Sequence, residues 1–209
     1  EIVLATTFTQ SEQVYENLER AREFEAEKNK LTFDSEIEAI YLVGAFGVST
    51  PGTFETLPRQ ALRYTGPFVL DALPRSAPIE DLVRHGLPFF NGRVRLSRRI
   101  DLDERAAQGR CLSFDEAMAH VVKLDVNGQA VRTWLWRPFE ADLDGLLRPG
   151  ANEIAFELTG GLRNLLGPHH LREGESYSVH PGLFFKEPNI WGSAPWDDGY
   201  CFVEFGLRF

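Results

Sequence analysis

The sequence predicts an all-β protein, a β-sandwich of the jelly-roll kind with one surface helix inserted near its N-terminus. Three observations predict this class. Apolar and polar residues alternate over several short stretches, such as 121–126. Asn127-Gly128, which follows that stretch, is the strongest short hairpin signal. Further turn residues, Asn91-Gly92 and Pro149-Gly150, separate the other short stretches, as is typical of sandwiches.

Length and charge limit the classes of function. The chain has 209 residues, with 22 Lys and Arg against 31 Asp and Glu, so its formal net charge is −9. An acidic balance argues against a general nucleic-acid binder, which gains affinity by neutralising phosphates. A hydrophobic content of 43% argues against disorder. No apolar run approaches the roughly 20 residues that cross a bilayer, so neither nucleic acid nor a membrane is an expected partner.

The first 50 residues predict strands around one helix. Residues 2–8 are β-forming and alternate, so the chain begins within a strand, and we expect a longer polypeptide before it. Thr9 with Glu12 is a capping-box pattern. The charged stretch that follows predicts a surface helix at about 11–29, laid across a sheet. Residues 37–48 are largely apolar and predict a buried strand.

Two short segments occur twice in the same order. Glu1–Leu4 is similar to Glu153–Phe156, and Tyr41–Val48 shares Tyr, four residues and Phe-Gly with Tyr200–Leu207. Such self-similarity is typical of a repeated structural unit, and chance is the alternative for matches this short. The repeat predicts two sandwiches of one type, the first of them incomplete.

A proline-rich segment separates the two expected units. Residues 51–85 hold five prolines, which interrupt regular strand pairing. We expect a connector there, with one short strand at 68–70 and one or two helical turns at 79–85. The expected organisation is therefore the C-terminal part of a preceding sandwich at 1–50, a connector at 51–85 and a complete sandwich at 86–209.

The second unit is predicted to consist of short strands joined by turns. Residues 94–102 alternate, but Arg98 falls on the inner side, which favours an edge strand. A turn begins at Asp142, ahead of a strand at 153–158. Cys111 and Cys201 lie far apart in strand-like stretches, so we expect two buried free thiols, with one disulfide as the alternative.

Several segments of this unit follow a family pattern. Val126–Gly128, Pro138–Leu143 and Leu146–Ile154 resemble the galactose-binding-like β-sandwich. The resemblance is to sugar-binding domains of glycoside hydrolase family 2 and to sandwiches of large α-L-rhamnosidase-like bacterial glycosidases. Leu87–Gly92 together with Leu162–His170 resembles accessory sandwich domains that follow the catalytic module in such enzymes.

The resemblance, which covers residues 86–209 well, implies a function. In such glycosidases these sandwiches are usually non-catalytic. The chain is therefore expected to be an accessory region that supports the catalytic module of a large bacterial glycoside hydrolase. Its partner would be the remainder of its own polypeptide, with carbohydrate as a second partner. The alternatives are an independent carbohydrate-binding module and a structural or adhesion sandwich without a sugar ligand.

The resemblance also bears on ions and location. No cofactor is expected. Related sandwiches often hold a structural Ca²⁺, for which Asp101 and Asp103 are the candidate ligands. A secreted or periplasmic location is slightly favoured over a cytoplasmic one.

Tryptophans are the main candidates for carbohydrate contact. A pyranose has one apolar face and a rim of hydroxyl groups, so aromatic rings beside amides and carboxylates suit it. Two tryptophans lie two positions apart on one predicted strand face, and two lie in a loop rich in Gly, Pro and Asp. Packing against a neighbouring domain is the competing interpretation. The candidate carbohydrate-binding residues are Trp134, Trp136, Trp191, Trp196, Asp197, Asn164 and His169.

Catalytic residues are not expected within the chain. Glycoside hydrolysis needs two carboxyl groups at a fixed separation, and the available pairs are Asp197 with Asp198 and Glu173 with Glu175. Adjacent side chains point apart, so we interpret these pairs as solvated loop residues. His169-His170 has no further ligand at metal spacing, which favours a packed loop over a metal site.

Overall fold

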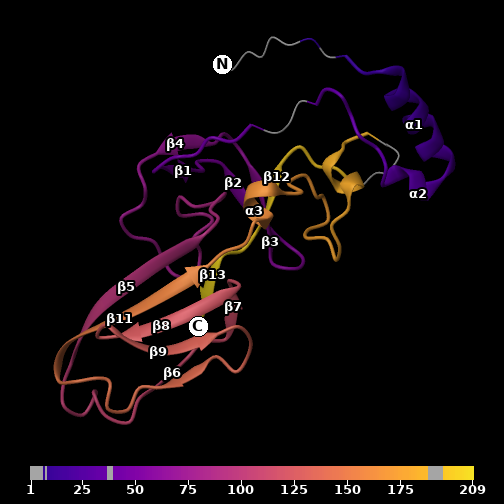
Figure 1. Cartoon of the computed structure of the whole chain (residues 1–209). Coiled ribbons are helices and arrows are strands. Elements are labelled where there is room, and N and C mark those ends of the chain that lie inside the picture. Colours follow the sequence, from indigo (N-terminus) through magenta and orange to yellow (C-terminus); the bar gives the residue numbers. More distant parts are fainter. Residues whose placement is uncertain (1–6, 8, 37–39, 188–194) are drawn as a thin grey trace.

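The computed structural model describes residues 7, 9–36, 40–187 and 195–209, and most of its regular structure is β-strand (Figure 1). This confirms the all-β class. In the part that is described, no helix has the length and apolar character needed to cross a membrane. The strand predicted at 2–8 lies outside the described residues, as does the Glu1–Leu4 copy of the repeat.

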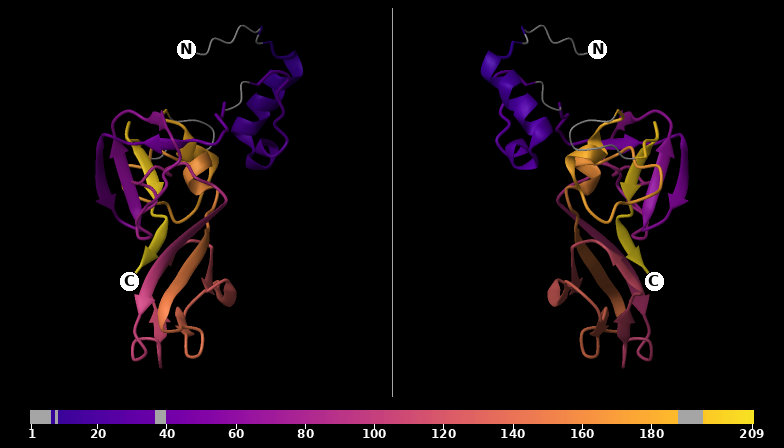
Figure 2. Two further views of the ribbon diagram at one scale, coloured as in Figure 1. Left: turned by 90° about the vertical axis from the view of Figure 1, so that its left-hand side faces the viewer. Right: turned by 90° about the vertical axis from the view of Figure 1, so that its right-hand side faces the viewer.

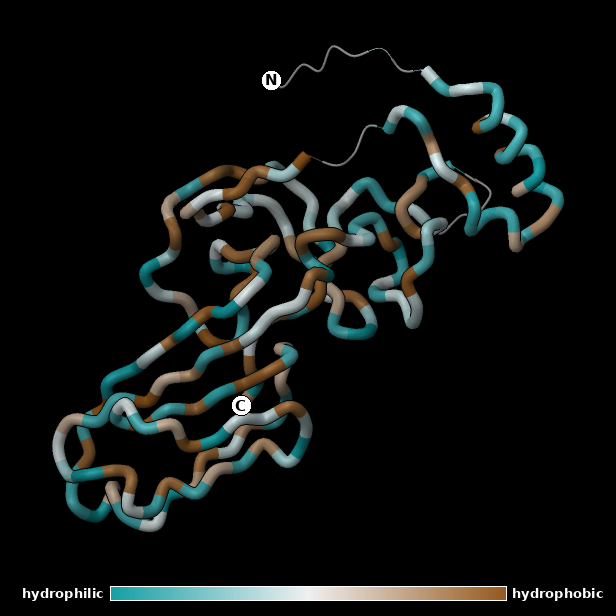
Figure 3. The backbone as a smooth tube through the Cα atoms, viewed as in Figure 1, coloured by the Kyte–Doolittle hydropathy of each residue, from teal (hydrophilic) through white to brown (hydrophobic). Residues whose placement is uncertain are grey.

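A four-stranded antiparallel sheet forms the most regular part of the molecule. Its order is β5-β11-β8-β9. One face is apolar because alternate residues point inward, and Figure 3 shows the resulting change of hydropathy along these strands. β5 lies at the edge, as Arg98 predicted. The strands are β5 (Arg93–Leu102), β8 (Val121–Val126), β9 (Gln129–Trp134) and β11 (Gly150–Thr159).

The predicted hairpin joins β8 to β9. Asn127 and Gly128 have φ angles of 51° and 80°. A type I′ turn requires positive φ at both central residues, so the Asn-Gly pair is the physical reason for this turn. The strand predicted at 153–158 is likewise present within β11.

Two short strand pairs share a core with this sheet. β6 (Cys111–Ser113) pairs with β10 (Glu140–Asp142), and β7 (Glu116–Met118) pairs with β13 (Gly206–Arg208). They belong to the same hydrophobic cluster as the sheet. Buried members of that cluster include Phe114, Leu124, Ala141, Phe156, Leu158 and Leu207.

The segment expected as a connector instead forms strands. β2 (Thr53–Leu57) and β3 (Ala61–Thr65) pair as a hairpin, and β12 (Tyr200–Val203) joins β3 to give the order β12-β3-β2. A shorter pair is β1 (Gly47–Ser49) with β4 (Val69–Asp71), close to the strand predicted at 68–70. The expectation that the prolines prevent regular pairing was wrong, because they lie between these strands rather than within them. The division of the chain at 51–85 stays a prediction.

Two further predictions from the first 85 residues are corrected. Residues 40–46 form no strand and Val43 is 93% exposed, so the described part of the buried strand predicted at 37–48 reduces to β1. The Tyr41 and Tyr200 copies of the repeat therefore differ, because only Tyr200 lies in a paired strand. Residues 79–85 form turns rather than helix, held by a hydrogen bond from the Leu87 N–H to the Leu82 carbonyl (3.1 Å).

The predicted N-terminal helix is present but breaks at Phe24 into α1 (Glu12–Glu23) and α2 (Glu25–Lys28). Its N-cap residue is Ser11, whose N–H donates to the Asp34 carboxylate (2.7 Å). The pair stands away from the sheets and does not lie across one (Figure 2). Two short elements remain, α3 (Arg163–Leu166) and the 3₁₀ turn η1 (Pro181–Phe184).

Candidate functional site

The structure separates the predicted carbohydrate-binding residues into buried and accessible ones. Trp134 ends β9 inside the core, where it is 3% exposed and its ring meets Phe114 edge-on at 5.2 Å. Trp136 is 74% exposed, because the chain leaves the strand after Trp134. The prediction that both share one strand face was therefore wrong, and Trp134 is not accessible to a sugar. Trp191 lies outside the described residues.

Asn164 is occupied in holding the backbone of β12. It lies in α3, 5% exposed. Its amide donates to the Val203 carbonyl (2.9 Å) and accepts from the Val203 N–H (2.8 Å). Buried polar groups need such partners, so Asn164 positions β12. Asn164 does not line the Trp196 hollow, and its role as a sugar contact stays a prediction.

His169 is also part of the interior. Its Nε2 lies 2.9 Å from the Asn164 carbonyl, and its ring lies against Phe89, Tyr200 and Phe202. Burial lowers the pKa of His169, so the neutral ring is favoured. His169 is half-buried in a packed loop and does not line the Trp196 hollow, so its role as a sugar contact stays a prediction.

Trp196 and Asp197 are the two predicted residues that do lie together at the surface. The Trp196 ring stacks on His170 with centroids 4.2 Å apart, and its Nε1 donates to the Asp198 carboxylate (3.1 Å). Arg172 donates to the Trp196 carbonyl (2.6 Å). Trp196, Asp197, Asp198 and Arg172 help to line a hollow of about 550 Å³, which we call the Trp196 hollow. Its described lining is Arg172, Lys186, Glu187, Pro195, Trp196, Asp197 and Asp198.

Three of the four candidate carboxylates, those of Asp197, Asp198 and Glu175, form ion pairs with cationic side chains. Asp197 pairs with Arg63 (3.0 Å), and Asp198 with Lys186 (3.1 Å). Hydrogen bonds from Lys186 and Trp196 lower the pKa of Asp198, which opposes a role as general acid. Glu175 forms a bidentate pair with Arg163, with nitrogen–oxygen distances of 2.6–2.9 Å. The ion pairs keep these three carboxylates in fixed positions, where they can accept hydrogen bonds from a ligand.

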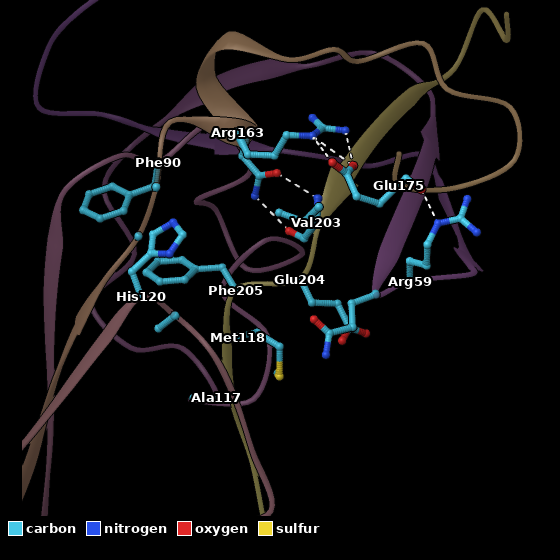
Figure 4. Close-up of a pocket in the computed structure, with 15 residues that line it drawn as sticks. Arg59, Phe90, Ala117, Met118, His120, Arg163, Glu175, Val203, Glu204 and Phe205 are labelled. Atoms are coloured by element: carbon cyan, nitrogen blue, oxygen red, sulfur yellow. Dashed lines mark hydrogen bonds and ion pairs between the residues drawn. The ribbon is translucent and has the colours of Figure 1, made fainter. Parts of the chain in front are cut away.

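A second depression, which the sequence did not reveal, lies where the strand layers meet (Figure 4). It has a volume of about 360 Å³, and we call it the junction pocket. The turn between β2 and β3, the β7–β8 connection, the loop after β11 and the end of β12 all contribute to it. Its polar lining side chains are Arg59, Gln60, His120, Arg163, Asn164, Glu175 and Glu204.

Two glycines shape the junction pocket. A Cβ on Gly161 would lie 2.1 Å from His120 Nε2, and one on Gly160 would lie 3.3 Å from the Phe205 ring. Only residues without a side chain let these two rings lie against the backbone. The Gly160-Gly161 pair at the end of a strand was the signal in the sequence that could have pointed to this site.

Metal-ligand clusters are not present in the described ranges, where no group of three or more His, Cys, Asp and Glu is placed to hold an ion. Asp103, a candidate Ca²⁺ ligand, accepts a hydrogen bond from the Ala106 N–H (2.7 Å) and so stabilises a turn. The calcium site at Asp101 and Asp103 stays a prediction. Both cysteines are free, Cys111 exposed and Cys201 buried.

Comparison with known proteins gives partial structural similarity only. No family model and no curated protein matches the chain. Among solved structures, a β-glucuronidase from Bifidobacterium dentium is 24% identical, with a TM-score of 0.33, over 56% of this chain and 19% of that one. A GH2 β-galacturonidase from Eisenbergiella tayi is 16% identical, with a TM-score of 0.32, over 77% and 23%.

A third structure, a rhamnosidase from Novosphingobium sp. PP1Y, is 18% identical, with a TM-score of 0.37, over 82% of this chain and 15% of that one. The three neighbours are glycoside hydrolases. The chain spans less than a quarter of the length of each.

Proposed function

We propose that the chain is a non-catalytic accessory region, of the galactose-binding-like jelly-roll type, in a large bacterial glycoside hydrolase. It supports the catalytic module and contacts carbohydrate through the Trp196 hollow. The observation that carries this proposal is a hydrogen-bonded cluster made by the residues on which the family resemblance depends. Those residues are the Val-Asn-Gly hairpin and the Gly-Ala-Asn turn.

The cluster joins the two motifs into one physical unit. Asn127 donates to the Asn152 side chain (2.9 Å) and to the Leu146 carbonyl (3.0 Å), and it accepts from the Glu153 N–H (2.9 Å). Asn152 is 2% exposed and donates to the carbonyls of Arg148 and Gly150. Motif residues that bond one another across 25 positions support a shared fold more strongly than separate matches would.

The Trp196 hollow supports a binding role. Trp196 supplies an apolar ring that His170 orients by stacking. Carboxylate and cationic groups of Asp197, Asp198 and Lys186 surround it and can bond hydroxyl groups. The same carboxylates are engaged by Arg63 and Lys186, which supports binding rather than acid catalysis.

Titration of tryptophan fluorescence tests the carbohydrate contact. Soluble plant-type oligosaccharides are expected to quench emission of the chain, and Trp196→Ala is expected to abolish the effect. Trp136→Ala is the matched control, because Trp136 is exposed but lies outside the hollow. No response of the wild-type chain to a broad glycan panel would contradict the binding role and favour a structural or adhesion sandwich.

The supporting role needs a separate experiment. The complete reading frame is expected to encode a catalytic glycosidase domain. Deleting the segment described here from that polypeptide is expected to lower the melting temperature of the catalytic domain. A reading frame without such a domain would contradict this part of the proposal, and with intact sugar binding it would favour an independent carbohydrate-binding module.

A further inference from the structure

The junction pocket is separate from the Trp196 hollow and has no role in the function proposed above. The two depressions share no lining residue. Figure 4 shows Phe90, His120 and Phe205 gathered on one side of the pocket, with Arg163, Glu175 and Glu204 on the other sides. The pocket therefore combines an aromatic wall with polar walls.

The charged groups around the pocket already have ion-pair or hydrogen-bond partners. Arg163 pairs with Glu175, and their side chains are 16% and 18% exposed. Glu204 pairs with Arg208 (2.8 Å). Arg59 donates to the backbone carbonyls of Glu173 and Glu175. A charged ligand would have to compete with these pairs and lose its own hydration, which opposes binding of an ion.

His120 is the polar lining residue whose side chain is not engaged in these interactions. Its side chain is exposed and takes part in no hydrogen bond or ion pair within the described residues. Because Gly161 has no side chain, the His120 ring can lie against its backbone; a Cβ at Gly161 would lie 2.1 Å from His120 Nε2. An imidazole can donate at one nitrogen and accept at the other, so His120 can bond a hydroxyl group in either sense.

The aromatic wall is also fixed in place. The rings of Phe90 and Phe205 are nearly parallel, at 14°, with centroids 6.1 Å apart. Phe205 is buried, whereas Phe90 is half-buried and keeps part of its ring in the pocket. A volume of about 360 Å³ falls in the range of pockets that hold small molecules.

We propose that the junction pocket binds one neutral pyranose residue, with its apolar face toward Phe90 and its hydroxyl groups toward His120, Gln60 and Glu204. Neutral polyols suit walls whose charged groups are already paired or hydrogen-bonded, whereas a uronate carboxylate would have to displace those partners. This inference rests on the proposed carbohydrate-contacting function and adds a second sugar contact to it. It also predicts a preference against the acidic sugars.

Ligand-observed and protein-observed NMR test the proposal on the whole chain. The probes are the methyl pyranosides of glucose and galactose, with the methyl glycosides of glucuronate and galacturonate as the matched acids. At least one neutral glycoside is expected to shift amide signals at the junction pocket, with an affinity at least tenfold above that of its matched acid. Equal or tighter binding of an acid, or no shift at the pocket with any neutral glycoside, would overturn the proposal.

Two variants assign the binding to the pocket. His120→Ala is expected to weaken the neutral glycoside at least tenfold without unfolding, because the side chain is exposed and unbonded. Gly161→Ala should weaken it as well, by displacing His120. His180→Ala, at another exposed histidine outside the pocket, is the control and should bind like the wild type. Unchanged affinity in both pocket variants would overturn the assignment.

The outcomes separate this inference from the proposed function. Oligosaccharide binding that Trp196→Ala abolishes, together with no pyranoside binding at the pocket, would defeat only the inference. Pyranoside binding that His120→Ala weakens, together with no effect of Trp196→Ala, would support the inference and leave the Trp196 hollow without a sugar.

Discussion

Two regions of this molecule contribute to one hydrophobic core, but their backbones are stabilised in different ways. The hairpin region, residues 91–159, is a sheet of regular strands with alternating burial. The closing region, residues 47–90 and 160–205, has short strands whose backbone is fixed by side chains such as Asn164 and Arg163. Residues of both regions lie in one hydrophobic cluster. Regular pairing needs only a repeating local pattern, whereas irregular backbone needs individual polar partners from distant positions.

The largest change in the free energy of unfolding is expected for a buried side chain of the hairpin region. Trp134→Ala should lower the free energy of unfolding by about 3–5 kcal/mol, because it removes a buried ring from the core. Trp136→Ala, two positions along, should change it by less than about 0.5 kcal/mol. Urea unfolding of both variants checks the contrast. Equal effects would mean that the side chains are not divided between core and solvent as described.

The next effect tests the one place where the hairpin region depends on a buried polar side chain. Asn152 is 2% exposed, donates to the Arg148 and Gly150 carbonyls and accepts from the Arg148 N–H. Asn152→Ala leaves these groups unpaired and should cost about 3 kcal/mol by urea unfolding. Asn17→Ala on α1 is the matched control and should fall within about 0.5 kcal/mol of the wild type. A small loss at Asn152 would mean that water replaces its bonds.

In the closing region, Asn164→Ala should cost about 2 kcal/mol, because both Val203 backbone groups lose their partner. Hydrogen exchange should show faster exchange of the Val203 amide. Asn164→Asp keeps the acceptor for that amide and should retain more of its protection. If β12 kept full protection in Asn164→Ala, the pairing with β3 alone would be sufficient, and the contrast between the regions would fail.

The smallest effect is a pH dependence confined to the closing region. Burial lowers the pKa of His169 below its ordinary value of 6.5. The folded state therefore binds fewer protons than the unfolded state, so the stabilising contribution is complete above pH 6.5 and is lost as pH falls toward the folded pKa. The slope cannot exceed about 1.4 kcal/mol per pH unit for one proton. Urea unfolding from pH 7.5 to 5 should show a smaller slope in His169→Gln, and equal slopes would contradict the assignment.

The sequence predicted the hairpin region better than the closing region, for a physical reason. Asn127-Gly128 determines its own turn, and alternation in β8 and β11 determines which side chains are buried. The β2–β3 hairpin carries no such signal, because its turn places Arg59 and Gln60, not an Asn-Gly pair, at positive φ. The other partner of β3, β12, lies far away in the chain, so strands in this segment were not predicted.

Prediction of the sites followed the same division. Trp196 and Asp197 could be found, since loop residues of this type are commonly accessible. The hydrogen bonds of Asn164 and His169 could not be predicted, because their partners are backbone groups from distant or irregular positions. The junction pocket was missed because six separate segments of the chain must come together to form it.

The pairing of β12 with β3 also bears on how the chain acquires its structure during synthesis. The β8–β9 hairpin closes across two residues, whereas the Arg63–Asp197 ion pair beside β12 joins positions 134 apart. Long loops close slowly, so the hairpin can form while the ribosome is still translating, and the three-stranded sheet must wait until residues 200–203 have emerged. Until then Leu62 and Tyr64 can pair with β2 but lack their partners in β12, so one edge of β3 stays unpaired and open to contact with other chains.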